Sequence, residues 1–392
     1  MRLSSLLLSA ISTVIATLSL EIGCRLVGYD FGREAYLMKR VPIFYRLPTV
    51  PVGEVFFRRQ GPDHWVGKVL STGPVSEAYR HEPDLDVTYD GLGFRNPDAL
   101  DDWDIVVVGD SFTELGNLPY EDLFTTRLGS LVRRRVKNLG VSSTGPLTHI
   151  FYLERYGRSR STKSALLVFY EGNDVIDLTR EQDDLDRYRG TGIRPRRDLR
   201  PQTSFLAALY RMLFRRPPAV APWAAAFDWR NAEFVAAGRS VPVSVLETAP
   251  GRRNLSSGQR NLLEQAVARW GETARRLHLH PWLVYMPCKR RVLHGHLRFR
   301  KNAARAIVNW RPTDLPDAMR CLVANNRIGF IDVAPALIEE TKHGHLTYNA
   351  VWDPHLNGRG ARVVAEEMAR ALTQTGQSGL TDIGSVARGG CW

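Results

Sequence analysis

Short apolar runs alternate with amphipathic segments from residue 104 onward. The first run, residues 105–108, is Ile-Val-Val-Val followed by Gly109, which is typical of a strand buried on both faces of a parallel sheet. Further runs of this kind occupy residues 136–139, 165–170, 282–285 and 328–332. Helical periodicity separates them, over 123–136, 147–156, 257–277, 318–326 and 361–372, with Ser257 as the expected cap of the third helix. This order predicts βαβ units and therefore an α/β, flavodoxin-like fold, in which a mostly parallel sheet lies between two layers of helices.

Three regions fall outside this rhythm. Residues 24–100 are rich in proline, glycine and aromatic residues, and they predict irregular or short β structure. Residues 180–255 interrupt the pattern with charges and prolines and predict a helical insertion over the sheet. An apolar helix at 205–214 within it is either part of a structural lid or an interfacial helix that touches a membrane or an acyl chain. Residues 376–392 are rich in glycine and serine and predict a disordered tail, which leaves residues 101–375 as the α/β domain.

The N-terminal segment carries no charge from Leu3 to Leu20. About 18 such residues are enough for a helix to cross the roughly 30 Å hydrocarbon layer of a membrane. No convincing cleavage site follows, so residues 1–23 are expected to form an uncleaved signal anchor. The basic residues Arg25, Arg33 and Arg40 beyond it would, by the positive-inside rule, keep that side in the cytoplasm. Because a lone anchor on an otherwise soluble domain commonly serves export, we expect a membrane-anchored protein with an extracytoplasmic, periplasmic domain.

The formal net charge of +12 comes mainly from arginine, in short runs such as residues 133–135. No nucleic-acid-binding module accompanies these runs, so we expect solvated surface and no nucleic-acid partner. The four cysteines show neither a CxxC pair nor a zinc-site spacing, and they define no disulfide framework, although Cys288 could pair with Cys321. The two His-Gly-His pairs, at 294–296 and 343–345, lack a third ligand at a telling spacing, and surface histidines are the favoured interpretation.

Polar residues follow the expected strands. Gly109-Asp110-Ser111 comes directly after the first strand, and reactive groups of parallel sheets gather at this edge. Ser111 is therefore a candidate nucleophile, although Gly-Asp-Ser is also an ordinary turn. The second strand runs into a loop of small residues, 138–146, and the third ends at Glu171-Gly172-Asn173-Asp174. Asn173 either belongs to a plain turn or offers a side-chain N–H to an oxyanion.

A fourth motif, Asp353-Pro354-His355-Leu356-Asn357, precedes the last expected helix. A lone histidine near a helix start is commonly structural. Here Asp353 could hold the imidazole Nδ1–H of His355, which leaves Nε2 to take a proton from a serine. Four such loops on one sheet favour a serine nucleophile with a histidine base.

The ordered motifs resemble the SGNH (GDSL) hydrolase family over roughly residues 90–375. The matching stretches are Gly109-Asp110-Ser111, Asn138-x-Gly140, Asn173 between Gly172 and Asp174, and Asp353-x-His355-x-Asn357. The upstream stretch 90–96, Asp-Gly-Leu-Gly-Phe-Arg-Asn, is similar to the lead-in of membrane-anchored bacterial members. The single residue between Asp353 and His355, where the family more commonly has two, resembles the alginate O-acetyltransferase branch.

This resemblance implies roles for individual residues. Ser111 would be the nucleophile, His355 the base and Asp353 the acid that orients it. Ser111, through its N–H, and Asn173, through its side chain, would stabilise the oxyanion. The glycine of the family's second block falls on Ser143, whose N–H can still donate.

The loop around Ser143 contains two alternative donors. Gly145 and Gly140 are glycines of the same small-residue stretch, and either could supply the oxyanion N–H in place of Ser143.

The resemblance implies a serine-dependent esterase that acts on O-acylated carbohydrate or another small ester, without a metal or organic cofactor. One alternative is an O-acetyltransferase of an exopolysaccharide that uses the same residues. The other is a catalytically silent polysaccharide-binding or assembly protein on this fold, against which the joint presence of Ser111, Asn173, Asp353 and His355 argues.

Overall fold

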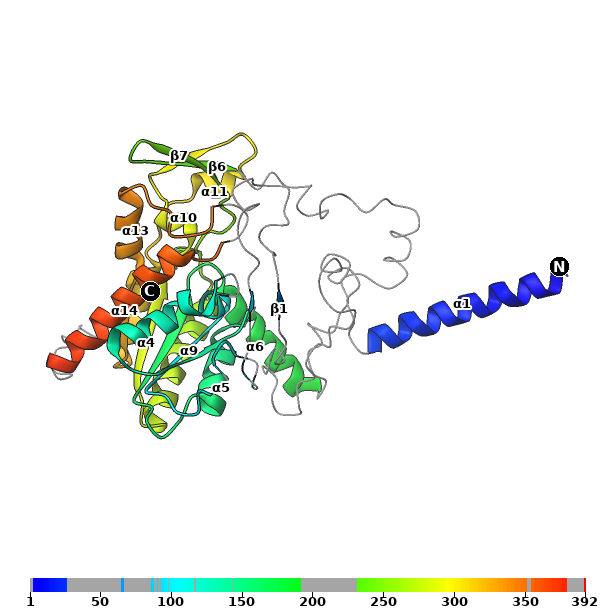
Figure 1. The fold of residues 1–392 in the computed structure, drawn as a ribbon, viewed down its shortest axis with the longest axis horizontal. Coiled ribbons are helices and arrows are strands. Elements are labelled where there is room, and N and C mark those ends of the chain that lie inside the picture. The colour runs from blue at the N-terminus through cyan, green and yellow to red at the C-terminus, as the bar shows by residue number, and fades with distance from the viewer. Residues whose placement is uncertain are drawn as a thin grey trace.

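The computed structural model describes residues 3–26, 65–66, 86–87, 90, 92, 94–97, 99–115, 118–142, 144–191, 231–350, 354–378 and 391–392. Within these residues, a five-stranded parallel sheet is the centre of the α/β domain, and a three-stranded antiparallel sheet accompanies it (Figure 1).

The central sheet has the strand order β10-β8-β5-β3-β4, and all neighbouring strands are parallel. Its strands are β3 (Ile105–Gly109), β4 (Val136–Gly140), β5 (Ser164–Tyr170), β8 (His280–Met286) and β10 (Gly329–Asp332). Numbered along the chain, this is the order 2-1-3-4-5 of flavodoxin-like sheets, whose switch point lies between the first and third strands. The predicted fold class is confirmed, and every predicted strand forms.

The strand registers bring the loops of interest to one edge. Gly109 at the end of β3 pairs with Gly140 at the end of β4, and Tyr170 at the end of β5 pairs with Met286 of β8. The segments that begin at residues 110, 141, 171 and 287 therefore all leave the sheet on the same side.

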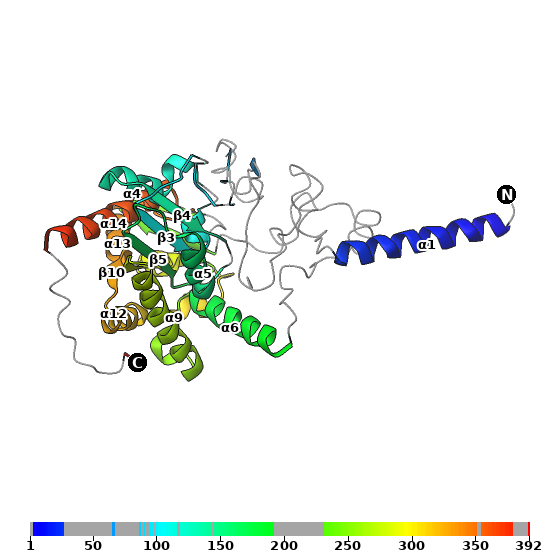
Figure 2. The ribbon, with the colours of Figure 1, turned by 90° about the horizontal axis from the view of Figure 1, so that it is seen from below.

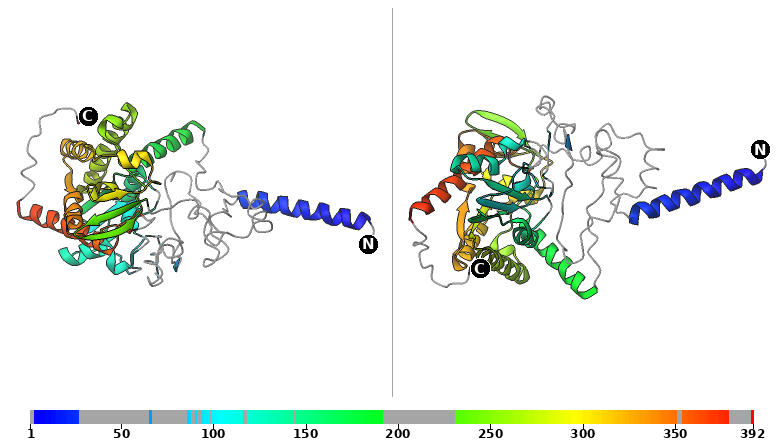
Figure 3. Two further views of the ribbon diagram at one scale, coloured as in Figure 1. Left: turned by 90° about the horizontal axis from the view of Figure 1, so that it is seen from above. Right: turned by 60° about the horizontal axis from the view of Figure 1, so that its bottom comes forward.

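Alternate residues of each strand face opposite helical layers. Ile105 and Val107 of β3 belong to the core that includes α4 (Phe124–Val132), α13 (Ala334–Lys342) and α14 (Gly358–Ser378). Val106 and Val108 belong to the core that includes α5 (Pro146–Tyr156), α9 (Ser257–Arg276) and α12 (Leu315–Asn325). Figures 2 and 3 show these layers on either side of the sheet. The apolar runs are continuous because both faces of each strand are buried.

The predicted helices form, with differences at their ends. The cap of α9 is Ser256 rather than Ser257: its Oγ accepts the N–H of Gln259 at 3.1 Å, and the Gln259 side chain accepts the N–H of Ser256 at 3.0 Å. This reciprocal arrangement is a capping box, which satisfies two otherwise unpaired helix donors. α4 ends at Val132, earlier than predicted, because Arg133 adopts a left-handed conformation with φ 53°.

The antiparallel sheet was not predicted. It consists of β6 (Ala232–Ala236), β7 (Arg239–Val243) and β9 (Leu297–Phe299), with β6 in the middle. Ala237 and Gly238 join β6 to β7 with positive φ angles of 47° and 72°, a hairpin turn that usually carries Asn-Gly and was therefore missed. The region predicted as a helical insertion thus ends in a β-hairpin, while α6 (Asp174–Thr191) extends into its beginning. The predicted apolar helix at 205–214 lies outside the described residues.

The predicted disordered tail, residues 376–392, is described only at its two ends, and residues 379–390 lie outside the described residues. α14 continues to Ser378, and Cys391 forms a disulfide with Cys321 of α12. The indole N–H of Trp392 donates to Glu264 of α9, so the C-terminus lies beside these helices (Figure 2). The pairing of Cys288 with Cys321 is wrong, because Cys288 is buried as a free thiol.

The N-terminal residues form α1 (Leu3–Leu26), and the short strands β1 (Trp65–Val66) and β2 (Asp86–Val87) pair in antiparallel fashion. Large apolar side chains along α1 are exposed: Ile11, Val14, Ile15, Leu18, Leu20 and Ile22. Across the residues described in the structure, no helix meets the length and hydropathy needed to cross a membrane. The signal anchor therefore stays a prediction.

Candidate active site

The turn after β3 presents Ser111. A Cβ on Gly109 would lie 2.0 Å from the Thr113 Oγ1, so only glycine allows the chain to fold back this tightly. Asp110 then caps α3 (Ser111–Glu114), because its Oδ1 accepts the N–H of Phe112 at 2.9 Å. Ser111 is the first residue of this short helix and is half-buried. The predicted nucleophile therefore stands at the carboxyl edge of the sheet.

Hydrogen bonds and an ion pair from residues 90–96 hold this turn in place. The Arg95 guanidinium donates to the carbonyl of Leu115, which ends α3, at 2.5 Å. Asn96 exchanges two hydrogen bonds with the backbone of Asn138 on β4, each 2.8 Å long. The buried pair Asp90–Lys137, at 2.7 Å, fixes the same stretch to β4. The motif recognised in the sequence thus fastens α3 and β4 together.

His355 lies against the nucleophile turn. Its ring centroid is 4.8 Å from that of Phe112, which in turn stacks on Tyr170 at 3.6 Å. The carbonyl of His355 accepts hydrogen bonds from the backbone N–H of Asn349 at 3.0 Å and from its side chain at 3.3 Å. A histidine 244 residues away from Ser111 in sequence is thereby packed against the residue that follows Ser111.

Asn173 belongs to the same group. Its carbonyl accepts the N–H groups of Ile176 and Asp177, both at 2.8 Å, which begins α6. Its side-chain NH₂ donates to the Asp110 Oδ2 at 3.2 Å. An NH₂ group has two hydrogens, so one remains after this bond. The structure brings Asn173 beside the Ser111 turn.

Most N–H groups of the 140–145 loop are already engaged inside the protein. The N–H of Gly140 donates to the Asn138 side chain at 2.8 Å. The N–H of Val141 donates to the Gly109 carbonyl at 3.0 Å, and that of Ser142 to the Glu114 carboxylate at 2.6 Å. Gly145, an expected oxyanion donor, directs its N–H to the Glu181 Oε1 at 2.7 Å instead. Ser143 lies outside the described residues, as does Asp353, the acid expected to orient His355.

Glu181 of α6 closes this loop and was not recognised in the sequence. Its carboxylate accepts the N–H groups of Gly145, Leu147 and Thr148 at the start of α5. Burial raises the pKa of Glu181 to about 7, although these donors lower it. An acid residue in the middle of a charged helix looks solvated in sequence, and only the packing of α6 against α5 makes it a cap.

Two buried carboxyl groups lie next to the nucleophile. Burial raises the pKa of Asp110 to about 6, while the Phe112 N–H and the charge of His355 lower it. Burial and the charge of Asp110 raise the pKa of Asp174 well above its usual value. Electrostatic effects are mutual, so an ionised Asp110 favours the protonated form of His355. This role of Asp110 was not foreseen from the sequence.

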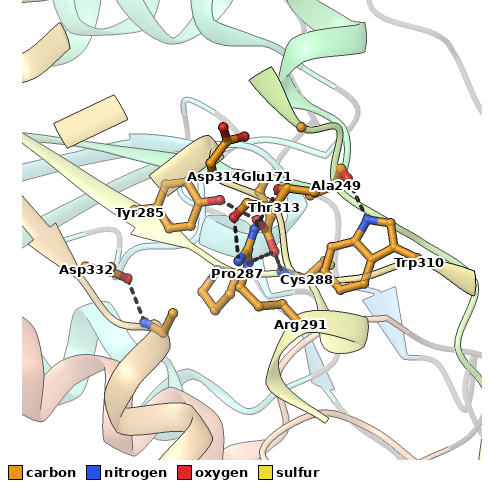
Figure 4. A network of polar contacts seen from close by, with 12 residues as sticks. Glu171, Ala249, Tyr285, Pro287, Cys288, Arg291, Trp310, Thr313, Asp314 and Asp332 are labelled. Carbon is orange, nitrogen blue, oxygen red and sulfur yellow. Dashed lines mark hydrogen bonds and ion pairs between the residues drawn. The ribbon is translucent and has the colours of Figure 1, made fainter. Parts of the chain in front are cut away.

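A buried ion pair holds the turn before Asn173. Glu171, fully buried, accepts the Arg291 Nε at 2.8 Å and faces its Nη2 at 2.7 Å (Figure 4). It also accepts the N–H of Cys288 at 2.8 Å and the hydroxyl of Tyr285. Thr313 accepts two further guanidinium N–H groups through its carbonyl and Oγ1, at 3.1 and 2.9 Å. Several hydrogen bonds therefore surround each charge of the pair and offset the cost of its burial.

Among the described residues, no cluster of three or more His, Cys, Asp or Glu side chains is suited to hold a metal ion.

No protein-family model matches the sequence, and no curated protein matches it significantly. Several solved structures are similar to it. One is a lipolytic protein of the G-D-S-L family from Veillonella parvula, which is 13% identical. The match covers 69% of this chain and 98% of that chain, with a TM-score of 0.37. A putative G-D-S-L protein from Desulfitobacterium hafniense is 13% identical over 68% and 98% of the two chains, with a TM-score of 0.34. A catalytic mutant of an acetylxylan esterase from Geobacillus stearothermophilus is 12% identical over 69% and 94%, with a TM-score of 0.35. Overlaps of this extent say nothing about the family or the substrate of this chain.

Proposed function

We propose that the protein is a serine-dependent ester hydrolase. The observation that carries this proposal is the packing of the His355 ring on Phe112, the residue after Ser111, with centroids 4.8 Å apart; the charge of His355 also acts on Asp110, the residue before Ser111. A base packed against the turn that presents a half-buried serine is the arrangement that nucleophilic acyl chemistry needs.

In the proposed reaction, His355 takes the proton of the Ser111 hydroxyl while the Oγ attacks the ester carbonyl. The C–O bond to the alcohol then breaks, and His355 returns the proton to that leaving alcohol. Water, deprotonated by the same imidazole, hydrolyses the acyl-enzyme. Asp353 would orient the ring, and ionised Asp110 adds a negative charge that favours the imidazolium.

For the tetrahedral oxyanion we propose three donors: the N–H of Ser111, the N–H of Ser143 and the second N–H of the Asn173 side chain. The engagement of Gly140 and Gly145 elsewhere supports Ser143 over these alternatives. Each such donor contributes about 3 kcal/mol to the transition state.

We further propose an O-acylated carbohydrate as the substrate, and a membrane-anchored enzyme whose domain lies outside the cytoplasm. The disulfide between Cys321 and Cys391 supports export, since disulfides persist in oxidising compartments. The exposed apolar side chains of α1 support its burial in a membrane. A reporter fused after residue 40 tests the topology, and a cytoplasmic signal would contradict it.

Turnover of p-nitrophenyl acetate by the full chain tests the hydrolase. We expect Ser111→Ala to lower kcat by about 10⁴-fold or more. Ser130→Ala, on the exposed face of α4, is the matched control and should keep full activity. Adding oligosaccharide acceptors and searching for acetylated sugar by mass spectrometry separates hydrolysis from acyl transfer.

A further inference from the structure

Three consecutive cations stand at the start of α10 (Lys289–Val292), directly after the end of β8. Lys289, Arg290 and Arg291 are only 3%, 3% and 7% exposed. Buried charges are costly unless polar groups surround them, so each must have a partner. Successive residues of a helix point about 100° apart, so three neighbouring side chains reach three different segments.

Arg291 reaches the turn that carries Asn173. Its bidentate contact with Glu171 fixes the residue two positions before Asn173, and its bonds to Thr313 fix the guanidinium in turn (Figure 4). The N–H of Cys288 on the same carboxylate adds a direct link from the end of β8. The position of the Asn173 turn thus depends on α10.

Lys289 reaches the loop that carries His355. Its ammonium donates to the carbonyls of Asn349 and Ala350, the latter at 2.9 Å. Asn349 in turn donates its backbone N–H and its side chain to the carbonyl of His355. One residue therefore connects the start of α10 to the backbone of the proposed base.

Arg290 reaches the antiparallel sheet. Its guanidinium lies over the rings of Phe299 and Trp310, at 5.0 and 5.4 Å, and donates to the carbonyls of Ile307 and Trp310 at 3.1 and 3.0 Å. The segment after β9 is thereby fastened to the same helix.

We propose that Lys289, Arg290 and Arg291 form a three-way brace that sets the geometry of the catalytic edge, with Lys289 as a positioning residue for His355. This inference rests on the proposed function. Without the ammonium, the Asn349 carbonyl loses this donor while the Ala350 carbonyl keeps the N–H of Ser244 at 2.9 Å, and Asn349, with the His355 backbone that it holds, relaxes away from α10. A displacement of about 1 Å between base and nucleophile costs on the order of 100-fold in rate.

The test is Lys289→Met in the full chain, which keeps the length of the side chain and removes its charge and donors. Active sites are counted by covalent labelling of Ser111 with a fluorophosphonate, and kcat for p-nitrophenyl acetate is divided by that count. We expect kcat per labelled site to fall by about 30- to 100-fold, with KM changing less than about threefold. If this variant does not fold, Lys289→Gln, which keeps an N–H donor, should show a fall of about 10-fold by the same measurements.

The brace is proposed to act through His355. In a His355→Ala background, adding Lys289→Met should therefore lower the rate of fluorophosphonate labelling by less than about threefold. Arg252→Met is the matched control, since Arg252 also donates to a backbone carbonyl, that of Cys391 at 2.9 Å, but on the α9 side of the molecule. It should leave kcat per site unchanged. An unchanged kcat per site in Lys289→Met overturns the brace and leaves the proposed function standing. The same follows if Lys289→Met lowers the labelling rate equally with and without His355. Full turnover in His355→Ala would instead overturn the proposed function.

Discussion

Two runs of three consecutive basic residues lie at opposite ends of the strands of the parallel sheet, one at the amino ends and one at the carboxyl ends. Arg133, Arg134 and Arg135 precede β4 and are all exposed, whereas Lys289, Arg290 and Arg291 follow β8 and are all buried. Arg135 pairs at 2.8 Å with Asp102 while half of its side chain stays in water, but Arg291 meets Glu171 in the protein interior. Runs of basic residues are therefore solvated at one end of the strands and hold the protein interior together at the other.

The acidic residues of the two edges differ in the same sense. Hydrogen bonds from Ser161 and Ser159 hold the pKa of Asp102 well below its usual range. Burial raises the pKa values of Asp110 and Glu181 at the catalytic edge. Hydrogen bonds at one end and burial at the other, rather than the number of charges, decide whether the ionised carboxylate is favoured.

The largest expected effect is on the buried pair. Arg291→Met leaves the Glu171 carboxylate without its counter-charge, and removing one partner of a buried ion pair costs about 3–5 kcal/mol. Denaturant unfolding of the full chain measures this loss. The double variant Arg291→Met, Glu171→Met should recover at least half of it, because no charge is then left buried. A loss below about 1 kcal/mol in the single variant would show that the buried pair stabilises the protein no more than an exposed ion pair does.

A pH-dependent effect is expected from Glu181. Its folded pKa of about 7 exceeds an unfolded value near the ordinary 4.5, so the folded state binds the proton more tightly. The stabilisation is fully present below pH ~4.5 and is lost as pH rises through ~7, a change of about 3 kcal/mol. Glu181→Gln has no such proton, so its stability relative to the parent should rise over this window in paired unfolding curves. A constant difference between the two curves would contradict the burial of an ionisable group there.

The smallest effect is expected at the amino edge. Arg135→Met removes an ion pair whose arginine is 51% exposed, and such pairs contribute about 0.2–1 kcal/mol. Arg160 is exposed, and Arg160→Ser should change stability by less than about 0.5 kcal/mol. Loss of more than 2 kcal/mol in either variant, measured by the same unfolding assay, would mean that this edge also depends on its charges.

The two basic runs look alike in sequence, and only the structure shows that one of them is buried. Other features of the fold and of the site were predictable. The strands were predictable because β-branched runs such as 105–108 admit few other structures, and the parallel sheet followed from the alternation of strands and helices. The position of Ser111 was predictable because a small-residue turn follows the first strand, and that of His355 because its motif precedes the last helix. The bonds of Lys289 and Glu181 were not, because their partners lie 60 and 36 residues away. The hairpin of β6 and β7 was missed because Ala-Gly occupies a turn that usually carries Asn-Gly.

The central claim is that Ser111 is a nucleophile activated by His355. Incubation of the full chain with a fluorophosphonate, in which the serine Oγ forms a bond to phosphorus and fluoride leaves, followed by mass spectrometry of the peptides, tests it directly. We predict one adduct, on Ser111, which forms at least about 100-fold more slowly in His355→Ala. No adduct, or an adduct on another serine with Ser111 unmodified, would contradict it.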